Sequence, residues 1–176
     1  VAAIDPLLSV VVVTGSNPSA STPNMVGAGR IVRELRRHAP GVRTALCGLH
    51  PSALPRQTLE QEDVDFVCVG EGFLTLPALI EAVRAGHPGP VVGAWRWIDG
   101  QPAAGPPAPL TADLDALPMP AWDLLPMARY RAHNWHCFDD IEARQPYAVI
   151  YTSLGCPFSC SFCCTNALFG RRGIRY

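Results

Sequence analysis

The 176-residue sequence lacks any apolar run long enough to span a membrane, and it lacks an excess of charge of either sign. Its longest apolar run, from Leu7 to Val13, has the length of a β-strand. The chain has 14 basic and 15 acidic residues, which gives a net charge of −1. Binding to nucleic acid requires a basic surface. We therefore expect neither membrane insertion nor nucleic-acid binding.

The sequence also lacks the features of a secreted domain held together by disulfides. It has an odd number of cysteines, seven, and no recognisable signal peptide. Its hydrophobic fraction of 48% is sufficient for a core that needs no covalent cross-links. These features favour the reducing cytoplasm. Four cysteines are predicted to be buried small apolar residues, namely Cys47, Cys68, Cys137 and Cys164.

Proline is abundant, and its distribution divides the chain. The 18 prolines concentrate between residues 88 and 126, where they interrupt any periodic pattern. We therefore predict a first domain over residues 1–105, a linker over 106–146 and the start of a second domain over 147–176.

The first domain alternates predicted strands with helices. The apolar run over 7–13 is typical of a strand in a parallel sheet buried on both faces. The sequence Ser21-Thr22-Pro23 predicts a helix cap, and helical spacing from Met25 to Leu35 predicts a helix that Pro40-Gly41 ends.

The same alternation continues to the linker. Strands are predicted over 42–47 and 65–69, and a helix over 74–85. Trp95 and Trp97, followed by Asp99-Gly100, predict a short hairpin strand. This order of elements indicates an α/β fold with a doubly wound, Rossmann-like sheet, which binds ligands at the carboxyl ends of its strands.

Cysteines near the end of the chain carry the clearest chemistry. Cys156, Cys160 and Cys163 are spaced C-x3-C-x2-C, after Gly155 and an apolar run over 147–152 that predicts a strand. Cysteine thiolates hold cubane iron–sulfur clusters, and a short loop with this spacing can place three of them around one face. One iron is then left without a protein ligand.

A structural zinc site is the alternative to an iron–sulfur cluster. Such sites usually take four ligands from two pairs of cysteine or histidine, and no second pair follows Cys164. His133, His136 and Cys137 lie upstream, and they could supply the missing ligands.

The cysteine loop resembles that of the radical S-adenosylmethionine family, whose signature is C-x3-C-x-aromatic-C, with Phe162 as the aromatic residue. The resemblance implies a partial (β/α) barrel that begins with the strand over 147–152. It implies that the three cysteines ligate a 4Fe-4S cluster whose fourth iron is chelated by S-adenosylmethionine. An electron from the cluster would then cleave the sulfonium and release an adenosyl radical, with Phe162 beside the adenine.

The loops that follow the three predicted strands resemble those of the cobalamin-binding domain that precedes the barrel in one class of this family. The second loop of that class reads G-G-x-H-P-[ST]-A-L-P and the third reads G-E-G-[ED]. Cys47 and Phe73 stand here in place of a glycine and an acid. The resemblance also covers the segment 114–126, and it does not assign His50 as a cobalt ligand. The cobalamin contacts that it implies are Thr14, Ser16, Gly48, His50, Pro51, Ser52, Gly70 and Glu71.

Taken alone, these loops have simpler interpretations. His50 beside a proline is typical of a hydrogen-bonded turn residue, and Gly70-Glu71-Gly72 is typical of a flexible turn before a helix. The order of the loops and the cysteine motif along one chain favours the cobalamin interpretation.

The resemblance implies that the chain is a fragment, since it starts at Val1 without an initiator methionine and holds one barrel strand. We expect it to be inactive alone. The leading hypothesis is a cobalamin-dependent radical S-adenosylmethionine enzyme that methylates an unactivated carbon of a small molecule, supplied with electrons by a flavodoxin or ferredoxin. The alternatives are a cyclase or rearrangement enzyme of tetrapyrrole or natural-product biosynthesis, a corrinoid-binding module with a vestigial cysteine loop, and a non-catalytic domain with structural zinc.

Overall fold

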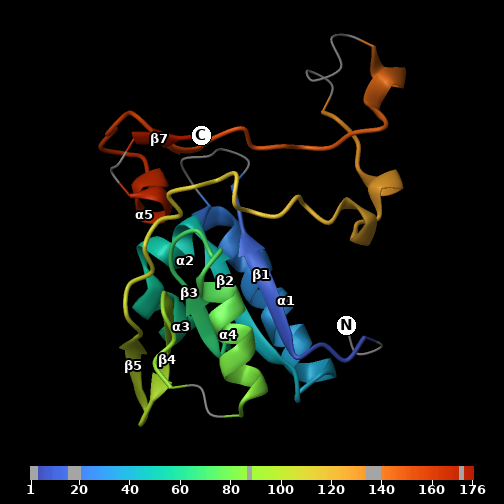
Figure 1. Cartoon of the computed structure of the whole chain (residues 1–176). Coiled ribbons are helices and arrows are strands. Elements are labelled where there is room, and N and C mark those ends of the chain that lie inside the picture. The colour runs from blue at the N-terminus through green and yellow to red at the C-terminus, as the bar shows by residue number, and fades with distance from the viewer. Residues whose placement is uncertain (1–3, 16–20, 87–88, 134–139, 171–172) are drawn as a thin grey trace. The chain divides into compact units, whose positions relative to one another are not determined.

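The computed structural model describes residues 4–15, 21–86, 89–133, 140–170 and 173–176. They form two compact units (Figure 1). The first unit comprises Val1–Ala112 with Gly155–Ile174, and the second comprises Asp113–Leu154 with Arg175–Tyr176.

A five-stranded sheet forms the centre of the first unit, with its strands in sequence order. The first three strands are parallel, and the last two form an antiparallel hairpin. Asp99 and Gly100 have positive φ at its turn, which confirms the predicted hairpin. The strands are β1 (Leu8–Val13), β2 (Arg43–Gly48), β3 (Phe66–Cys68), β4 (Ala94–Ile98) and β5 (Gln101–Ala104).

The first strand is less buried than its apolar sequence predicts. Val13 is buried, whereas Val12 on the opposite face is 59% exposed. Among the described residues β1 pairs with β2 alone, so it lies at an edge of the sheet, where one face stays partly uncovered. The prediction of a strand buried on both faces is therefore wrong for β1.

Helices connect the parallel strands. The predicted helix after β1 is confirmed as α1 (Met25–His38), and the one after β3 as α4 (Thr75–Arg84). Ser21 does not cap the helix as predicted, because its side chain bonds another loop and a 3₁₀ turn over Thr22–Asn24 comes first.

The sequence predicts a loop between β2 and β3, but this connection is helical. It consists of α2 (Leu49–Ala53) and α3 (Pro55–Gln61). Because β2 and β3 are parallel neighbours, the chain must return from the carboxyl end of β2 to the side of the sheet where the parallel strands begin. These two helices provide that crossover.

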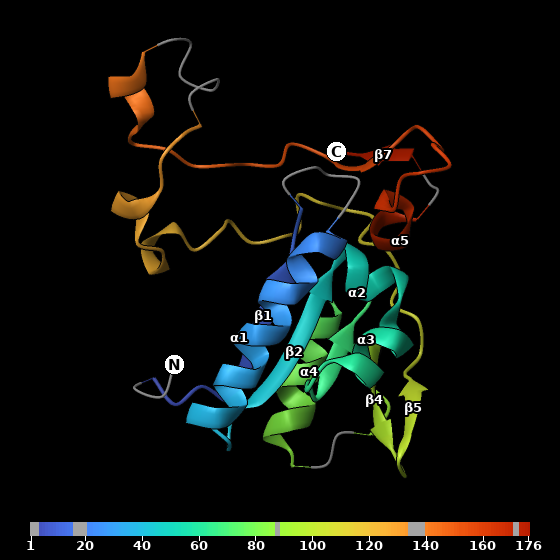
Figure 2. The ribbon, with the colours of Figure 1, turned by 180° about the vertical axis from the view of Figure 1, so that it is seen from behind.

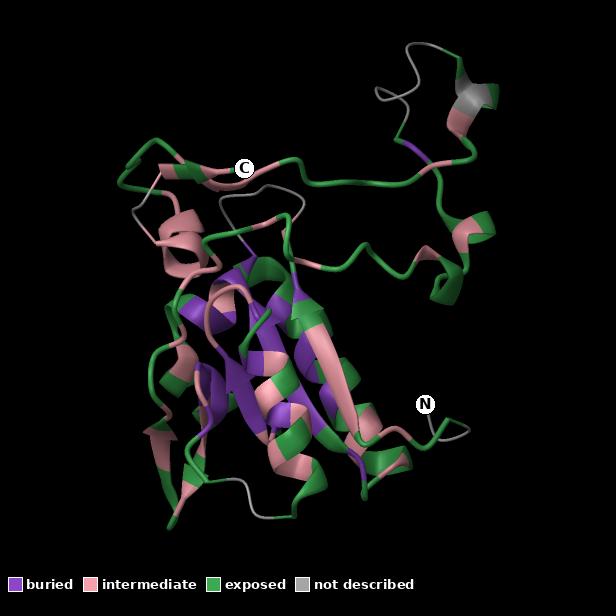
Figure 3. Cartoon of the chain, viewed as in Figure 1, coloured by how far each residue is buried: buried purple, intermediate pink, exposed green. Residues whose placement is uncertain are grey.

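The helices cover both faces of the sheet, which confirms the doubly wound α/β class. Figure 2 shows α1 and α3 on one face, and Figure 1 shows α4 on the other. Val32 of α1 and Leu59 of α3 pack with Leu46 and Val67. Leu79 of α4 packs on the opposite face among alternate strand residues. Buried residues therefore concentrate on the sheet and the helix faces toward it (Figure 3).

The predicted strand over 147–152 is not formed. This segment belongs to no helix or strand, and Ile150 and Tyr151 are 70% and 82% exposed. A short two-stranded sheet follows instead, made of β6 (Leu154–Cys156) and β7 (Gly173–Arg175), with α5 (Thr165–Phe169) between them in the sequence. A strand requires a neighbouring strand, and neither sheet of the described residues includes 147–152. The described residues include no helix that is long and apolar enough to cross a membrane.

Candidate functional site

Loops at the carboxyl ends of β1 and β2 pack tightly against each other. Gly48 ends β2 with φ of +117°, a conformation that other residues rarely adopt. A Cβ there would collide with the Val13 carbonyl oxygen of β1. Glycine is therefore required at this position, and its missing side chain lets the two backbones approach.

His50 is fixed by the segment that leads into α1. Its backbone N–H donates to Ser21 Oγ at 2.8 Å, and its Nδ1 lies 3.0 Å from Thr22 Oγ1. Ser21 is buried and His50 half-buried. Sequence reasoning placed Ser21 and Thr22 in a helix cap and missed this role, because their partner lies 28 or more residues away.

Ser52 joins the second loop to the third. Its Oγ accepts a hydrogen bond from the backbone N–H of Gly70 at 3.0 Å, and Ser52 and Pro51 are both buried. Glu71 Oε2 accepts from the backbone N–H of Thr111 at 2.9 Å. These two predicted cobalamin contacts thus hold the loops in place in this structure.

The remaining predicted contacts lie at the carboxyl edge of the sheet, which is the side where the parallel strands β1, β2 and β3 end. Thr14 is exposed after β1, and its carbonyl accepts from the Asn24 side chain. Ser16 lies outside the described residues. The structure therefore brings together Thr14, Gly48, His50, Pro51, Ser52, Gly70 and Glu71, while their contacts with cobalamin stay a prediction.

A cavity of about 400 Å³ opens beside this edge. It is lined mainly by small and apolar residues, among them Gly70, Gly93, Trp95 and Ala108 from the sheet side and Leu168 from α5. Small residues leave backbone accessible to a large flat molecule. The carboxyl-edge loops therefore fit a corrinoid in chemistry and in accessible surface.

The predicted cluster ligands lie on one short, accessible loop. Cys160 is exposed, and Cys156 and Cys163 are half-buried. Hydrogen bonds from the side chain and the backbone of Thr165 lower the pKa of the Cys163 thiol, and the thiolate is the form that binds metal. Phe162 is 81% exposed.

The described residues contain no group of three or more cysteine, histidine, aspartate or glutamate side chains gathered for a metal. The donor set nevertheless fits an iron–sulfur cluster, because the three thiols of the C-x3-C-x2-C loop are free of disulfides and share one loop. The loop has to close for these sulfurs to bind one cluster. Of the alternative zinc ligands, His133 is exposed, and His136 and Cys137 lie outside the described residues.

The other cysteines divide into two kinds. Cys47 and Cys68 are buried, as predicted. Burial raises the pKa of the Cys47 thiol to about 11, and burial with the neighbouring Cys47 raises that of Cys68 to about 12, so both stay protonated and unreactive. Cys164 is half-buried, so its predicted burial is wrong: it is the N-cap residue of the short helix α5 and lies at the surface of the loop. The prediction for Cys137 falls outside the described residues.

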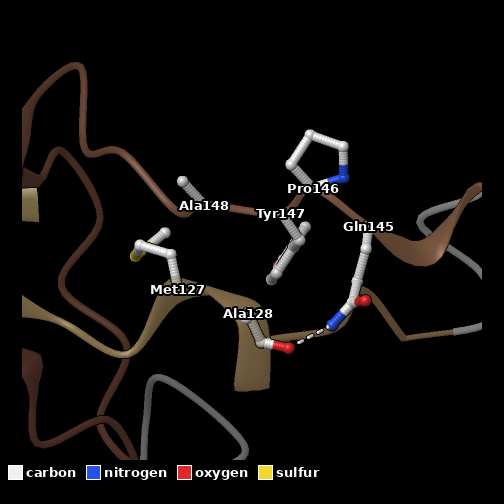
Figure 4. A pocket seen from close by; sticks show the side chains of 6 residues that line it. All are labelled: Met127, Ala128, Gln145, Pro146, Tyr147 and Ala148. Atoms are coloured by element: carbon white, nitrogen blue, oxygen red, sulfur yellow. Dashed lines mark hydrogen bonds between the residues drawn. The ribbon is translucent and has the colours of Figure 1, made fainter.

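The second unit holds an apolar hollow of about 620 Å³. Met127 and Tyr147 lie on opposite walls, and Gln145 Nε2 donates to the Ala128 carbonyl oxygen at 2.7 Å (Figure 4). Among the described residues, no carboxylate, histidine or cysteine lines it. The hollow therefore carries no candidate acid, base or metal ligand from the described part of the chain.

Comparison with known proteins identifies the family of the first unit. Residues 8–80 match the family model described as the B12 binding domain. The first unit therefore contains a cobalamin-binding domain.

The relatives extend the similarity over most of the chain. The chain is 32% identical over 156 residues to an uncharacterized methyltransferase of Pyrococcus horikoshii, with 88% of this chain and 32% of that protein covered. It is 30% identical over 151 residues to the anaerobic magnesium-protoporphyrin IX monomethyl ester cyclase of Rubrivivax gelatinosus, with 82% and 26% covered. The chain thus spans a third or less of the length of these curated relatives.

A solved structure shares the fold. It is the radical S-adenosylmethionine methyltransferase TsrM from Kitasatospora setae with cobalamin and a [4Fe-4S] cluster bound, with a TM-score of 0.50 at 21% identity. The match covers 57% of this chain and 20% of that one. The chain belongs to the same family as these curated relatives, and residues 8–80 form its B12 binding domain.

Proposed function

We propose that this chain is part of a cobalamin-dependent radical S-adenosylmethionine enzyme that methylates an unactivated carbon of a small molecule. The observation that carries the proposal is the pairing, along one chain, of a B12-binding domain with a loop of three free cysteines spaced C-x3-C-x2-C. When bound, the cluster would supply an electron to the sulfonium of S-adenosylmethionine, and the corrinoid would carry the methyl group.

The residues of the first unit would hold and orient the corrinoid. Gly70 keeps backbone accessible at the carboxyl edge, Gly48 lets the ends of β1 and β2 pack closely, and Thr14 is exposed. The Ser52 hydrogen bond to Gly70 fixes two of the loops relative to each other, so the binding surface is preorganised.

The residues of the cysteine loop would hold the cluster. Cys156, Cys160 and Cys163 would ligate it, and the hydrogen bonds from Thr165 favour the thiolate of Cys163. Phe162 would pack against the adenine of S-adenosylmethionine. Electrons would come from a flavodoxin or a ferredoxin.

Anaerobic reconstitution with ferrous iron, sulfide and zinc in competition tests the cluster, with metal and sulfide analysis of the purified chain. We expect iron with inorganic sulfide and a charge-transfer absorbance. Cys160→Ala should lose most of both. Cys164→Ala is the matched control, because this cysteine adjoins the same loop and is not a predicted ligand, so its iron content should stay unchanged.

Each alternative result would support a different function or refute an assignment. Zinc without sulfide would point to a structural metal site and would refute radical chemistry. In a parallel incubation with hydroxocobalamin, cobalt binding by a chain that takes up no iron would identify a corrinoid-binding module with a vestigial loop. A cluster absorbance that survives Cys160→Ala unchanged would refute the ligand assignment.

A cyclase is the second candidate function, and the similarity to the Rubrivivax gelatinosus cyclase favours it specifically. Product analysis of the longest reading frame that contains this chain, supplied with S-adenosylmethionine labelled in its methyl group, distinguishes the two. Methylation transfers the label to the product, whereas ring closure does not.

A further inference from the structure

The cysteine loop continues directly into a helix. Cys164 is the N-cap residue of α5, and Cys163 Sγ lies 3.0 Å from Thr165 Oγ1 in its first turn. A displacement of α5 therefore moves these two cysteines with it.

This helix packs on the loops of the cobalamin-binding domain. Figures 1 and 2 both show α5 beside α2, and the two helices are in contact. The Leu168 carbonyl oxygen lies 3.8 Å from the position of a Cβ at Gly70. Because Ser52 of α2 also bonds Gly70, α5 rests on two loops that are themselves joined. Every residue of α5 is half-buried there.

A cavity remains beside α5 where this helix packs on the loops. Leu168 lines the cavity of about 400 Å³ together with Gly70 and Trp95. A cavity beside a packed helix forfeits the dispersion contacts that would fill it, which lowers the docking free energy and brings the docked and undocked states closer in energy. A ligand that orders the α2 and Gly70 loops favours the docked state, because α5 docks on those loops.

We propose that α5 is a positioning element, with Leu168 as its central side chain, that couples corrinoid binding at the carboxyl edge to the conformation of the cysteine loop. The inference rests on the corrinoid-binding part of the proposed function. The coupling is reciprocal: corrinoid binding raises the docking equilibrium constant of α5 by the same factor by which docking of α5 raises the affinity for the corrinoid. A variant in which α5 docks poorly therefore binds the corrinoid more weakly.

Alkylation of the cluster-free chain by iodoacetamide, read by mass spectrometry for each cysteine, tests this coupling with and without hydroxocobalamin. Cys160 is exposed and serves as an internal standard, while Cys163 and Cys164 are half-buried beside α5. We expect hydroxocobalamin to lower the rate at these two, relative to Cys160, by about fivefold or more. The buried Cys47 reports unfolding, because it reacts only in the unfolded chain.

Two variants separate coupling from direct shielding by the corrinoid. Leu168→Ala removes the side chain from the cavity wall, and we expect it to bind hydroxocobalamin more weakly and to lose most of the protection. Phe158→Ala removes an equally apolar side chain that is 70% exposed in the same loop, and it should keep the protection. Should Leu168→Ala render Cys47 reactive, the milder Leu168→Val carries the test.

The outcomes distinguish this inference from the proposed function. Bound hydroxocobalamin with an unchanged ratio of alkylation rates would overturn the coupling alone. Equal protection in wild type and the Leu168 variant would show direct shielding, and would also overturn it. No binding of hydroxocobalamin would overturn the corrinoid part of the proposed function and this inference with it.

Discussion

Gly48 is the residue on which the packing of the carboxyl edge depends most. Its φ of +117° and the nearby Val13 carbonyl oxygen leave no room for a side chain. We expect Gly48→Ala to lower the free energy of unfolding by about 3 kcal/mol, from backbone strain and displacement of β1. Urea denaturation followed by circular dichroism measures this loss.

Gly27 provides the matched control for that substitution. It lies in α1, and apart from its chain neighbours and the backbone of its own helix no atom lies within 4 Å of the position that a Cβ would take, so Gly27→Ala should raise the free energy of unfolding by about 0.5 to 1 kcal/mol. Equal effects at both glycines would contradict the packing described at Gly48.

Asp65 ties the starting ends of β2 and β3 together. Burial would raise the pKa of its carboxyl, but hydrogen bonds from Thr44 and Arg43, with the charge of Arg36, outweigh burial and hold the pKa below its usual value. A lowered pKa means that the folded state prefers the carboxylate. The resulting stability is therefore present above the unfolded-state pKa of about 4 and is lost as the pH falls through the folded-state pKa.

Asp65→Asn should lower the free energy of unfolding at pH 7 by about 2 kcal/mol, and the difference from wild type should shrink below about pH 4. Denaturation curves at several pH values measure it. Asp63→Asn is the control, because this carboxylate also pairs with Arg36 but is 60% exposed, and it should cost less than about 1 kcal/mol. A difference for Asp65 that persists unchanged at low pH would exclude the ionic explanation.

At the scale of elements, local sequence patterns predict some parts of this fold and not others. The apolar period gives α1 and α4, and the Trp95–Trp97 pattern with Asp99-Gly100 gives the β4–β5 hairpin. Prolines in the segment between β2 and β3 favour a loop in the sequence pattern, so α2 and α3 were not predicted. Pro55 occupies the first turn of α3, where its missing N–H costs no hydrogen bond, so it starts a helix rather than a loop.

The segment 147–152 shows a second limit of predicting secondary structure from local sequence patterns. Its β-branched and aromatic residues favour a strand, but a strand forms only against a partner, and local sequence does not show whether one is present. The site shows the same limit: glycines mark the loops, while the Ser21–His50 and Ser52–Gly70 bonds join distant parts of the chain.

Hydrogen exchange tests whether this segment forms a strand. Backbone amides over 148–152 should exchange much faster than those of the sheet, because no strand of the described part of the chain pairs with them. Amides of Ala45 and Leu46, in the centre of β2, should be among the slowest. Protection over 148–152 as strong as that of β2 would show that the segment is paired.

At the scale of the whole molecule, the chain places a B12 binding domain ahead of a loop with three cysteines spaced C-x3-C-x2-C. The two sites make separate demands on the chain, since corrinoid contacts depend on folded loops and cluster ligation depends on three thiols. Binding of hydroxocobalamin to the folded chain therefore does not require the cluster.

The cobalt content of the purified chain, after incubation with hydroxocobalamin and removal of the unbound corrinoid, measures this directly. The account predicts cobalt equimolar with protein in the wild type and in Cys160→Ala, and a marked loss in Gly48→Ala. A folded wild-type chain that retains no cobalt would contradict it.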